Sequence, residues 1–182
     1  MKVRDLFSIP NCLCYLRILI IPIFVTSYIK FENYPLAFGL LAFMEFTDFL
    51  DGLIARKFNM ITDWGKIIDP VADKLLQFSL LIVLMYRYKF ALVVCVLFVI
   101  KEVVLAVLGI ICVGVTKRIE GAKIWGKIST LVFYVSCLIL VIFPNIPNKF
   151  ANILLLITLA FLIYSFIVYA IFFTKGIKNK KY

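Results

Sequence analysis

The stretch TDFLDGLIARKFNMITDWGKIIDPVADK, residues 47–74, is the part of the chain that decides its fold. It places four aspartates within two apolar segments: Asp48, Asp51, Asp69 and Asp73. An aspartate at the centre of a membrane helix costs about 2.5–3.5 kcal/mol on insertion scales. Four such residues flanked by long hydrophobic runs therefore indicate a functional site rather than a contribution to stability.

The spacing of the aspartates predicts how they come together. Residues three or four apart share one face of a helix, and this is the spacing of Asp48 with Asp51 and of Asp69 with Asp73. The short polar segment 57–64 between the pairs predicts a turn that brings the second helix back antiparallel to the first. The two pairs of carboxylates then face each other at one membrane boundary.

The chemistry of this stretch predicts a site for a metal ion and a diphosphate. Four converging carboxylates repel one another unless a cation lies between them, and oxygen ligands suit Mg²⁺, Mn²⁺ or Ca²⁺ rather than zinc or copper. Gly52 and Ala55 leave one face of the first helix nearly bare, so that a ligand can approach the backbone. Arg56 adds a planar cation that matches phosphate oxygens.

The composition predicts an all-α, polytopic membrane helix bundle. The chain has 182 residues, of which 64% are hydrophobic, and its mean hydropathy is +1.08. A membrane span needs about 20 apolar residues, and such runs occur at 9–29, 34–55, 67–86, 90–115, 124–143 and 151–174. We therefore expect six transmembrane helices in a single membrane domain, residues 1–182.

The formal net charge of +10 predicts the orientation in the membrane. Basic residues mark the cytoplasmic side of membrane proteins. With the N-terminus inside, only Lys30, Arg87, Lys89 and Lys149 fall on the outer side. Both termini and the aspartates then face the cytoplasm across the cell (inner) membrane. The basic surface favours anionic lipids and phosphorylated substrates as partners, and we expect no nucleic-acid partner.

Histidine is absent and the five cysteines follow no regular pattern. Without histidine, acid–base chemistry falls to carboxylates. The cysteines have neither metal-ligand spacing nor a convincing disulfide framework.

The motif carries a family resemblance. The chain fits the pattern D-x2-D-G-x2-A-R-x8-G-x3-D-x3-D without a gap, at Asp48, Asp51, Gly52, Ala55, Arg56, Gly65, Asp69 and Asp73. In this it resembles the CDP-alcohol phosphotransferase family of integral membrane enzymes. The resemblance implies one or two Mg²⁺ or Mn²⁺ ions on the four aspartates, with Asp73 as general base. It also implies nucleotide or diphosphate binding at Gly52, Ala55, Arg56 and Gly65. Thr47 either hydrogen-bonds the nucleotide or bonds its own helix backbone.

Three further segments resemble one subgroup, the bacterial phosphatidylglycerophosphate synthases: residues 9–11 (IPN), 72–74 (ADK) and 126–127 (GK). This resemblance implies transfer of the phosphatidyl group of CDP-diacylglycerol to glycerol 3-phosphate, in phospholipid biosynthesis. It also implies a homodimer and a short N-terminal interfacial segment. Ser129 and Phe133 depart from the subgroup and leave the acceptor open. The alternatives are a cardiolipin synthase with phosphatidylglycerol as acceptor, or another CDP-alcohol phosphotransferase with a different acceptor. A cation transporter is disfavoured because the acids cluster on one side.

The remaining charged residues have two interpretations each. The candidates for binding the acceptor's phosphate are Lys101, Lys117, Arg118 and Lys127. Lys101 could instead form an internal ion pair with Glu102. Arg17 either faces a ligand or pairs with an acid of the motif. Glu45 either assists the site or pairs with a nearby cation, and Asp63 is expected to be a surface acid or helix cap.

Overall fold

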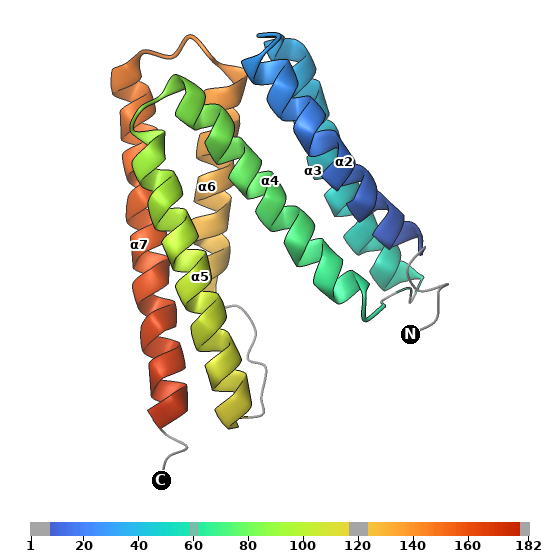
Figure 1. Ribbon diagram of the computed structural model, residues 1–182, viewed down its shortest axis with the longest axis vertical. Helices are drawn as coiled ribbons and strands as arrows, with labels where there is room; N and C mark the ends of the chain where they lie inside the picture. Colours follow the sequence, from blue (N-terminus) through green and yellow to red (C-terminus); the bar gives the residue numbers. More distant parts are fainter. Residues whose placement is uncertain (1–7, 59, 61, 117–123, 179–182) are drawn as a thin grey trace. The chain divides into compact units, whose positions relative to one another are not determined.

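The structure is a computed structural model that describes residues 8–58, 60, 62–116 and 124–178. These residues form six α-helices and no strand (Figure 1). The helices are α2 (Ile9–Ile29), α3 (Tyr34–Lys57), α4 (Gly65–Arg87), α5 (Ala91–Thr116), α6 (Ile124–Ile142) and α7 (Asn148–Lys178). The chain divides into two compact units, Met1–Arg87 and Tyr88–Tyr182. The all-α prediction is confirmed; the N-terminal interfacial segment falls outside the described residues.

Within the described ranges, three helices are long and apolar enough to cross a membrane: Ile9–Ile29, Ala91–Cys112 and Asn148–Thr174. A fourth apolar stretch, Gly126–Ile142, is shorter. α3 and α4 are less apolar because they carry the aspartates, together with Glu45, Arg56, Lys66 and Lys74. The described residues therefore contain six helices, as predicted, whereas six membrane spans remain a prediction.

The first unit is built on α2, which packs against both α3 and α4. α2 and α4 run in the same direction and α3 runs opposite to them (Figure 1). The buried residues of α2 recur every three or four positions, which places them on one face of the helix; among them are Cys14, Arg17, Phe24 and Tyr28. This face lies against the two helices that carry the aspartates.

The turn between α3 and α4 is fixed by Thr62. Its Oγ1 accepts a hydrogen bond of 2.9 Å from the backbone N–H of Gly65. Its carbonyl oxygen accepts a hydrogen bond of 3.2 Å from the backbone N–H of Lys66. These bonds satisfy N–H groups that have no partner inside the helix. α4 therefore begins at Gly65, two residues before the predicted span. Pro70 lies inside this helix.

In the second unit α7 packs on α5 and α6. α5 and α7 run in the same direction and α6 runs opposite (Figure 1). A Cβ on Gly126 would collide with the hydroxyl and ring of Tyr169, so α6 approaches α7 closely because residue 126 is glycine. One turn later, the Ser129 hydroxyl donates a 3.1 Å hydrogen bond to the carbonyl of Phe161.

Apolar side chains cover the outside of the second unit as well as its core. Along α5, large exposed residues include Leu92, Val96, Val99, Val103 and Val107. A soluble monomer rarely exposes a continuous apolar surface of this extent. A helix that is apolar all round is typical of a membrane span, which agrees with the hydropathy of α5 and α7.

Candidate active site

The four motif aspartates meet around one arginine of α2. Arg17 Nη1 lies 2.5 Å from Asp48 Oδ1 and 2.9 Å from Asp73 Oδ1, and Nη2 lies 2.5 Å from Asp51 Oδ2. The fourth carboxylate is farther, since Asp69 Oδ1 is 3.9 Å from Nη1. We refer to Asp48, Asp51, Asp69 and Asp73 as the aspartate tetrad. The four aspartates converge from two helices, as predicted, and α2 forms a third side of the site.

The tetrad has a buried side and an open side. The side chain of Arg17 is 0% exposed and that of Asp51 is 5% exposed. The side chains of Asp48, Asp69 and Asp73 are 40%, 48% and 41% exposed. Arg17 therefore lies on the protein side of the cluster, and three of the carboxylates remain accessible from outside.

Arg17 resolves one of the alternatives left by the sequence, because it pairs with the motif acids. Its single positive charge does not balance four carboxylates. Each carboxylate has two oxygens with about four lone-pair positions, so one hydrogen bond to a guanidinium leaves capacity for a metal ion. The tetrad therefore keeps a net negative charge even when it is paired with Arg17.

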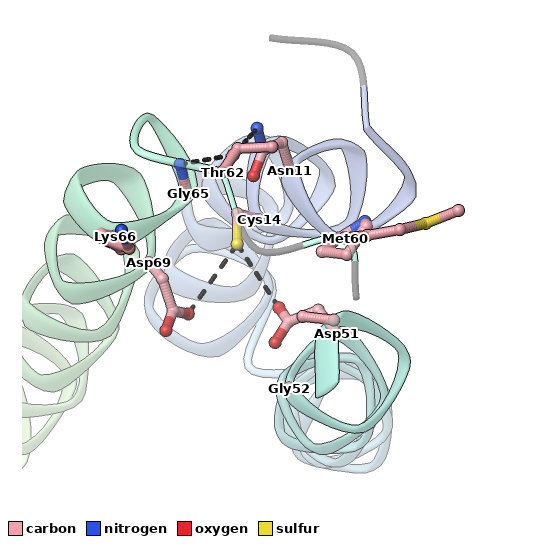
Figure 2. Close-up of a pocket in the computed structure, with 11 residues that line it drawn as sticks. Asn11, Cys14, Asp51, Gly52, Met60, Thr62, Gly65, Lys66 and Asp69 are labelled. Atoms are coloured by element: carbon pink, nitrogen blue, oxygen red, sulfur yellow. Dashed lines mark hydrogen bonds between the residues drawn. The ribbon is translucent and has the colours of Figure 1, made fainter. Parts of the chain in front are cut away.

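A cavity of about 140 Å³ lies beside the tetrad (Figure 2). Two tetrad members, Asp51 and Asp69, form part of its wall. The other lining residues come from the start of α2, from α3, and from the turn and first residues of α4: Pro10, Asn11, Cys14, Gly52, Ala55, Met60, Thr62, Gly65 and Lys66. The predicted Gly52, Ala55 and Gly65 all line this cavity, next to the carboxylates.

Asn11 joins the start of α2 to the turn before α4. Its Nδ2 donates a 3.1 Å hydrogen bond to Thr62 Oγ1. A Cβ on Gly65 would lie 2.7 Å from Asn11 Oδ1, closer than real Cβ contacts, and 3.0 Å from Thr62 Oγ1, which is a tight contact. Figure 2 shows the three residues together at one edge of the cavity. A larger residue at position 65 would have to displace the Asn11 and Thr62 side chains.

Cys14 lies between two tetrad carboxylates. Its Sγ is 3.4 Å from Asp51 Oδ2 and 3.8 Å from Asp69 Oδ1 (Figure 2). The residue is buried, with 2% exposure, and its thiol is a weak hydrogen-bond donor. All five cysteines are free thiols.

The residues of the tetrad fit a divalent cation. The ligand atoms of Asp48, Asp69 and Asp73 lie within 4.8 Å of one another, and so do those of Cys14, Asp51 and Asp69. The first of these groups consists of carboxylates alone, which favours Mg²⁺ or Mn²⁺ over softer ions. Its members are also the half-exposed acids, so an ion can reach them.

The remaining predicted residues of α3 are Thr47, Arg56 and Glu45, and their surroundings differ. The Thr47 hydroxyl is buried and donates a 2.8 Å hydrogen bond to the carbonyl of Met44, which is the helix-backbone alternative. Arg56 is exposed, and its Nη2 lies 3.6 Å from the position that a Cβ on Gly52 would take. Glu45 makes no ion pair in the part of the chain that the structure describes, and its Oε1 is buried without a hydrogen-bond partner. The ion pair predicted as one role of Glu45 is therefore not found there.

Asp63 is the surface acid that the sequence predicts. Its side chain is 93% exposed and lies 2.7 Å from Lys66 Nζ. The hydrogen bond and positive charge of Lys66 lower the pKa of Asp63, because they stabilise the carboxylate form. Asp63 belongs to the turn and not to the tetrad.

The acceptor-phosphate candidates belong to the second unit. Lys101 Nζ lies 3.2 Å from Glu102 Oε1, and the two side chains are 12% and 27% exposed, so the internal ion pair is present. Lys127 is exposed on α6. Lys117 and Arg118 lie outside the described residues.

Motif reasoning missed several cavity residues: Asn11, Cys14, Met60, Thr62 and Lys66. A signal for part of this set was present in the sequence. Asn11, Cys14 and Arg17 are each three positions apart, and residues with this spacing share one helix face. Three polar or polarizable residues on one face of an apolar helix indicate a face turned towards a site.

These features define the class of protein: an all-helical protein with membrane-length helices and a carboxylate cluster beside a small cavity. The chain belongs to the CDP-alcohol phosphatidyltransferase family, whose model matches residues 7–164. Several similar proteins carry the name CDP-diacylglycerol–glycerol-3-phosphate 3-phosphatidyltransferase. One from Rickettsia bellii is 34% identical over 72% of this chain and 68% of its own length. One from Aquifex aeolicus is 31% identical over 94% of this chain and 97% of its own. One from Salmonella paratyphi A is 30% identical over 86% of this chain and 88% of its own length.

Proposed function

We propose that this protein is an enzyme that transfers the phosphatidyl group of CDP-diacylglycerol to glycerol 3-phosphate, with release of CMP. The observation that carries the proposal is the convergence of the aspartate tetrad beside the cavity lined by Gly52, Ala55 and Gly65. The names of relatives that match most of the chain give the same activity. The product, phosphatidylglycerophosphate, belongs to phospholipid biosynthesis.

In this proposal the tetrad holds one or two divalent ions, Mg²⁺ or Mn²⁺. A bound ion neutralises the diphosphate and stabilises the CMP leaving group. The chain contributes the carboxylates, three of which α3 and α4 hold at hydrogen-bonding distance from Arg17 of α2. Phosphoryl transfer depends on positioning and charge more than on covalent chemistry by the protein. A site built on helices rather than on loops suits that requirement.

The cavity is the proposed place for the cytidine diphosphate. Gly52 and Ala55 of α3 line it and have no side chain larger than a methyl group, so a flat ligand can approach the helix. Arg56, exposed one turn after Gly52, would bind the diphosphate through its planar donors. Thr47 would act from within α3, by holding the helix turn that carries Asp48 and Asp51.

Asp73 is the proposed general base. It is 41% exposed, at the open side of the tetrad, where an acceptor hydroxyl could reach it. The hydroxyl oxygen forms a bond to the phosphatidyl phosphorus while the bond from that phosphorus to the CMP oxygen breaks. Asp73 takes the hydroxyl proton, and the electron pair of the broken bond leaves with CMP.

The wider arrangement rests on the sequence. We propose six membrane spans in one domain, with both termini and the tetrad at the cytoplasmic face of the cell membrane. The donor's acyl chains would lie between spans, and the protein would act as a homodimer. The acceptor's phosphate would bind among Lys101, Lys117, Arg118 and Lys127.

The test is CMP release from CDP-diacylglycerol by purified protein with Mg²⁺ or Mn²⁺. Glycerol 3-phosphate and phosphatidylglycerol are compared as acceptors, and wild type is compared with Asp73→Asn. Turnover with glycerol 3-phosphate that is lost in the variant is the expected result. Turnover only with phosphatidylglycerol would make the protein a cardiolipin synthase. No CMP with either acceptor would overturn the substrate assignment.

A further inference from the structure

We propose that Arg17 is a built-in counter-cation of the aspartate tetrad. It neutralises part of the tetrad's charge when no divalent ion is bound, and it weakens the binding of that ion. The proposal rests on the divalent-ion site of the proposed function but not on its lipid substrates.

The contacts of Arg17 are directed at the tetrad. Its two terminal nitrogens reach Asp48, Asp51 and Asp73 at 2.5, 2.5 and 2.9 Å. The remaining nitrogen, Nε, is buried without a hydrogen-bond partner. In the described part of the chain, the aspartates are therefore the hydrogen-bonding partners of this guanidinium.

The charge of Arg17 is permanent. An arginine side chain stays protonated in proteins, so this one cannot become neutral to relieve its burial. A buried charge needs a close partner of opposite sign, and the tetrad supplies it. Conversely, three carboxylates gathered by two helices repel one another, and the guanidinium between them offsets that repulsion.

Arg17 and a divalent ion act on the same carboxylates. Asp48 and Asp73 contact Arg17 Nη1 and also belong to the carboxylate group whose ligand atoms lie within 4.8 Å. An ion held there lies close to a guanidinium of the same sign of charge. Coulomb repulsion between them lowers the affinity for the ion, and in the absence of the ion Arg17 keeps the tetrad assembled.

The test uses Mn²⁺ alone, without CDP-diacylglycerol or an acceptor, on the full-length protein in detergent. The variant is Arg17→Met, which keeps much of the side-chain length and removes the charge. Two quantities are measured: the dissociation constant for Mn²⁺ by electron paramagnetic resonance, and Tm in EDTA and in saturating Mn²⁺. Because no substrate is present, failure of the lipid assignment does not affect the result.

We expect Arg17→Met to bind Mn²⁺ roughly tenfold more tightly than wild type. Its Tm in EDTA should fall by about 5 °C or more, and saturating Mn²⁺ should restore most of the loss, since a ligand stabilises the state that binds it. Asp51→Asn should weaken Mn²⁺ binding in both backgrounds, which locates the ion at the tetrad.

The matched control is Arg87→Met, at the other end of α4, where the guanidinium hydrogen-bonds the Tyr34 hydroxyl at 3.1 Å. Any loss of Tm in this variant should be equal in EDTA and in Mn²⁺. If Arg17→Met does not fold in EDTA, it is purified in Mn²⁺ and chelated afterwards, and unfolding on chelation supports the proposal. Weaker or unchanged Mn²⁺ binding by Arg17→Met, or an equal loss of Tm in both conditions, overturns it.

Discussion

Asn11 of α2 and Gly65 at the start of α4 approach each other so closely that a side chain at position 65 would displace the Asn11 amide. A Cβ on residue 65 would lie 2.7 Å from Asn11 Oδ1. Gly65 therefore has a packing role in addition to its place in the wall of the proposed nucleotide cavity. The contact ties the entry of α2, the α3–α4 turn and the cavity wall together.

Gly65→Ala should destabilise the protein and weaken donor binding. The added methyl group meets Asn11 Oδ1 and Thr62 Oγ1, and overpacking of this kind costs about 1–3 kcal/mol. Because both neighbours line the cavity, KM for CDP-diacylglycerol should rise by roughly tenfold. The measurements are Tm and the kinetics of CMP release.

The control for this change is Gly39→Ala, in α3, where an added Cβ has nothing within 4 Å. There the substitution should leave KM unchanged and Tm equal or higher, since alanine is favoured over glycine within helices by about 1 kcal/mol. Equal effects at positions 65 and 39 would contradict the packing role of Gly65.

Thr62→Val should loosen the turn before α4. Thr62 Oγ1 accepts from the Gly65 N–H at 2.9 Å and from Asn11 Nδ2 at 3.1 Å, and valine keeps the shape while removing the acceptor. Loss of such a cap costs about 1 kcal/mol, measurable as a lower Tm. Thr62→Ser keeps the oxygen, and its Tm should stay close to that of wild type. A fall in Tm as large as that of Thr62→Val would argue against the cap.

Asp51→Asn should abolish activity while Asp63→Asn preserves it. Asp51 is 5% exposed and bonded to Arg17, so its loss leaves the buried guanidinium short of a partner. We expect CMP release to fall by about 100-fold or more. Asp63, 93% exposed and paired with Lys66, lies outside the tetrad, and its variant should retain wild-type turnover. Comparable losses in both variants would show that charge in the turn, not the tetrad, controls the reaction.

The helices and the convergence of the aspartates could be predicted from local patterns. Ile9–Ile29 has the predicted bounds, and the three- and four-residue spacings bring the acids to one face of each helix. These features depend on periodicity and on turns, which a sequence shows directly.

The partner of the tetrad could not be chosen from local patterns. Whether Arg17 faces a ligand or an acid depends on how α2 packs against α3 and α4, which is a tertiary property. The start of α4 agrees with the predicted turn at 57–64: Thr62 caps the helix at Gly65, two residues before the apolar run begins.

The second unit offers a separate test, because Gly126 belongs to the segment 126–127 that resembles the phosphatidylglycerophosphate synthases and precedes the acceptor-phosphate candidate Lys127. A Cβ there would meet the hydroxyl and ring of Tyr169. Gly126→Ala should therefore separate α6 from α7 and lower stability by about 1–3 kcal/mol, seen as a fall in Tm. Gly114→Ala, at a glycine with nothing within 4 Å, is the matched control and should not lower Tm.

Tyr169→Phe decides between the two roles of Gly126. Removing the hydroxyl takes away the atom nearest to the added methyl group, so the double variant should recover part of the Tm lost in Gly126→Ala. A coupling of about 0.5–3 kcal/mol between the two positions is expected for residues in direct contact. If Gly126 instead serves the acceptor alone, the two changes should be additive in Tm, and Gly126→Ala should raise KM for glycerol 3-phosphate without altering stability.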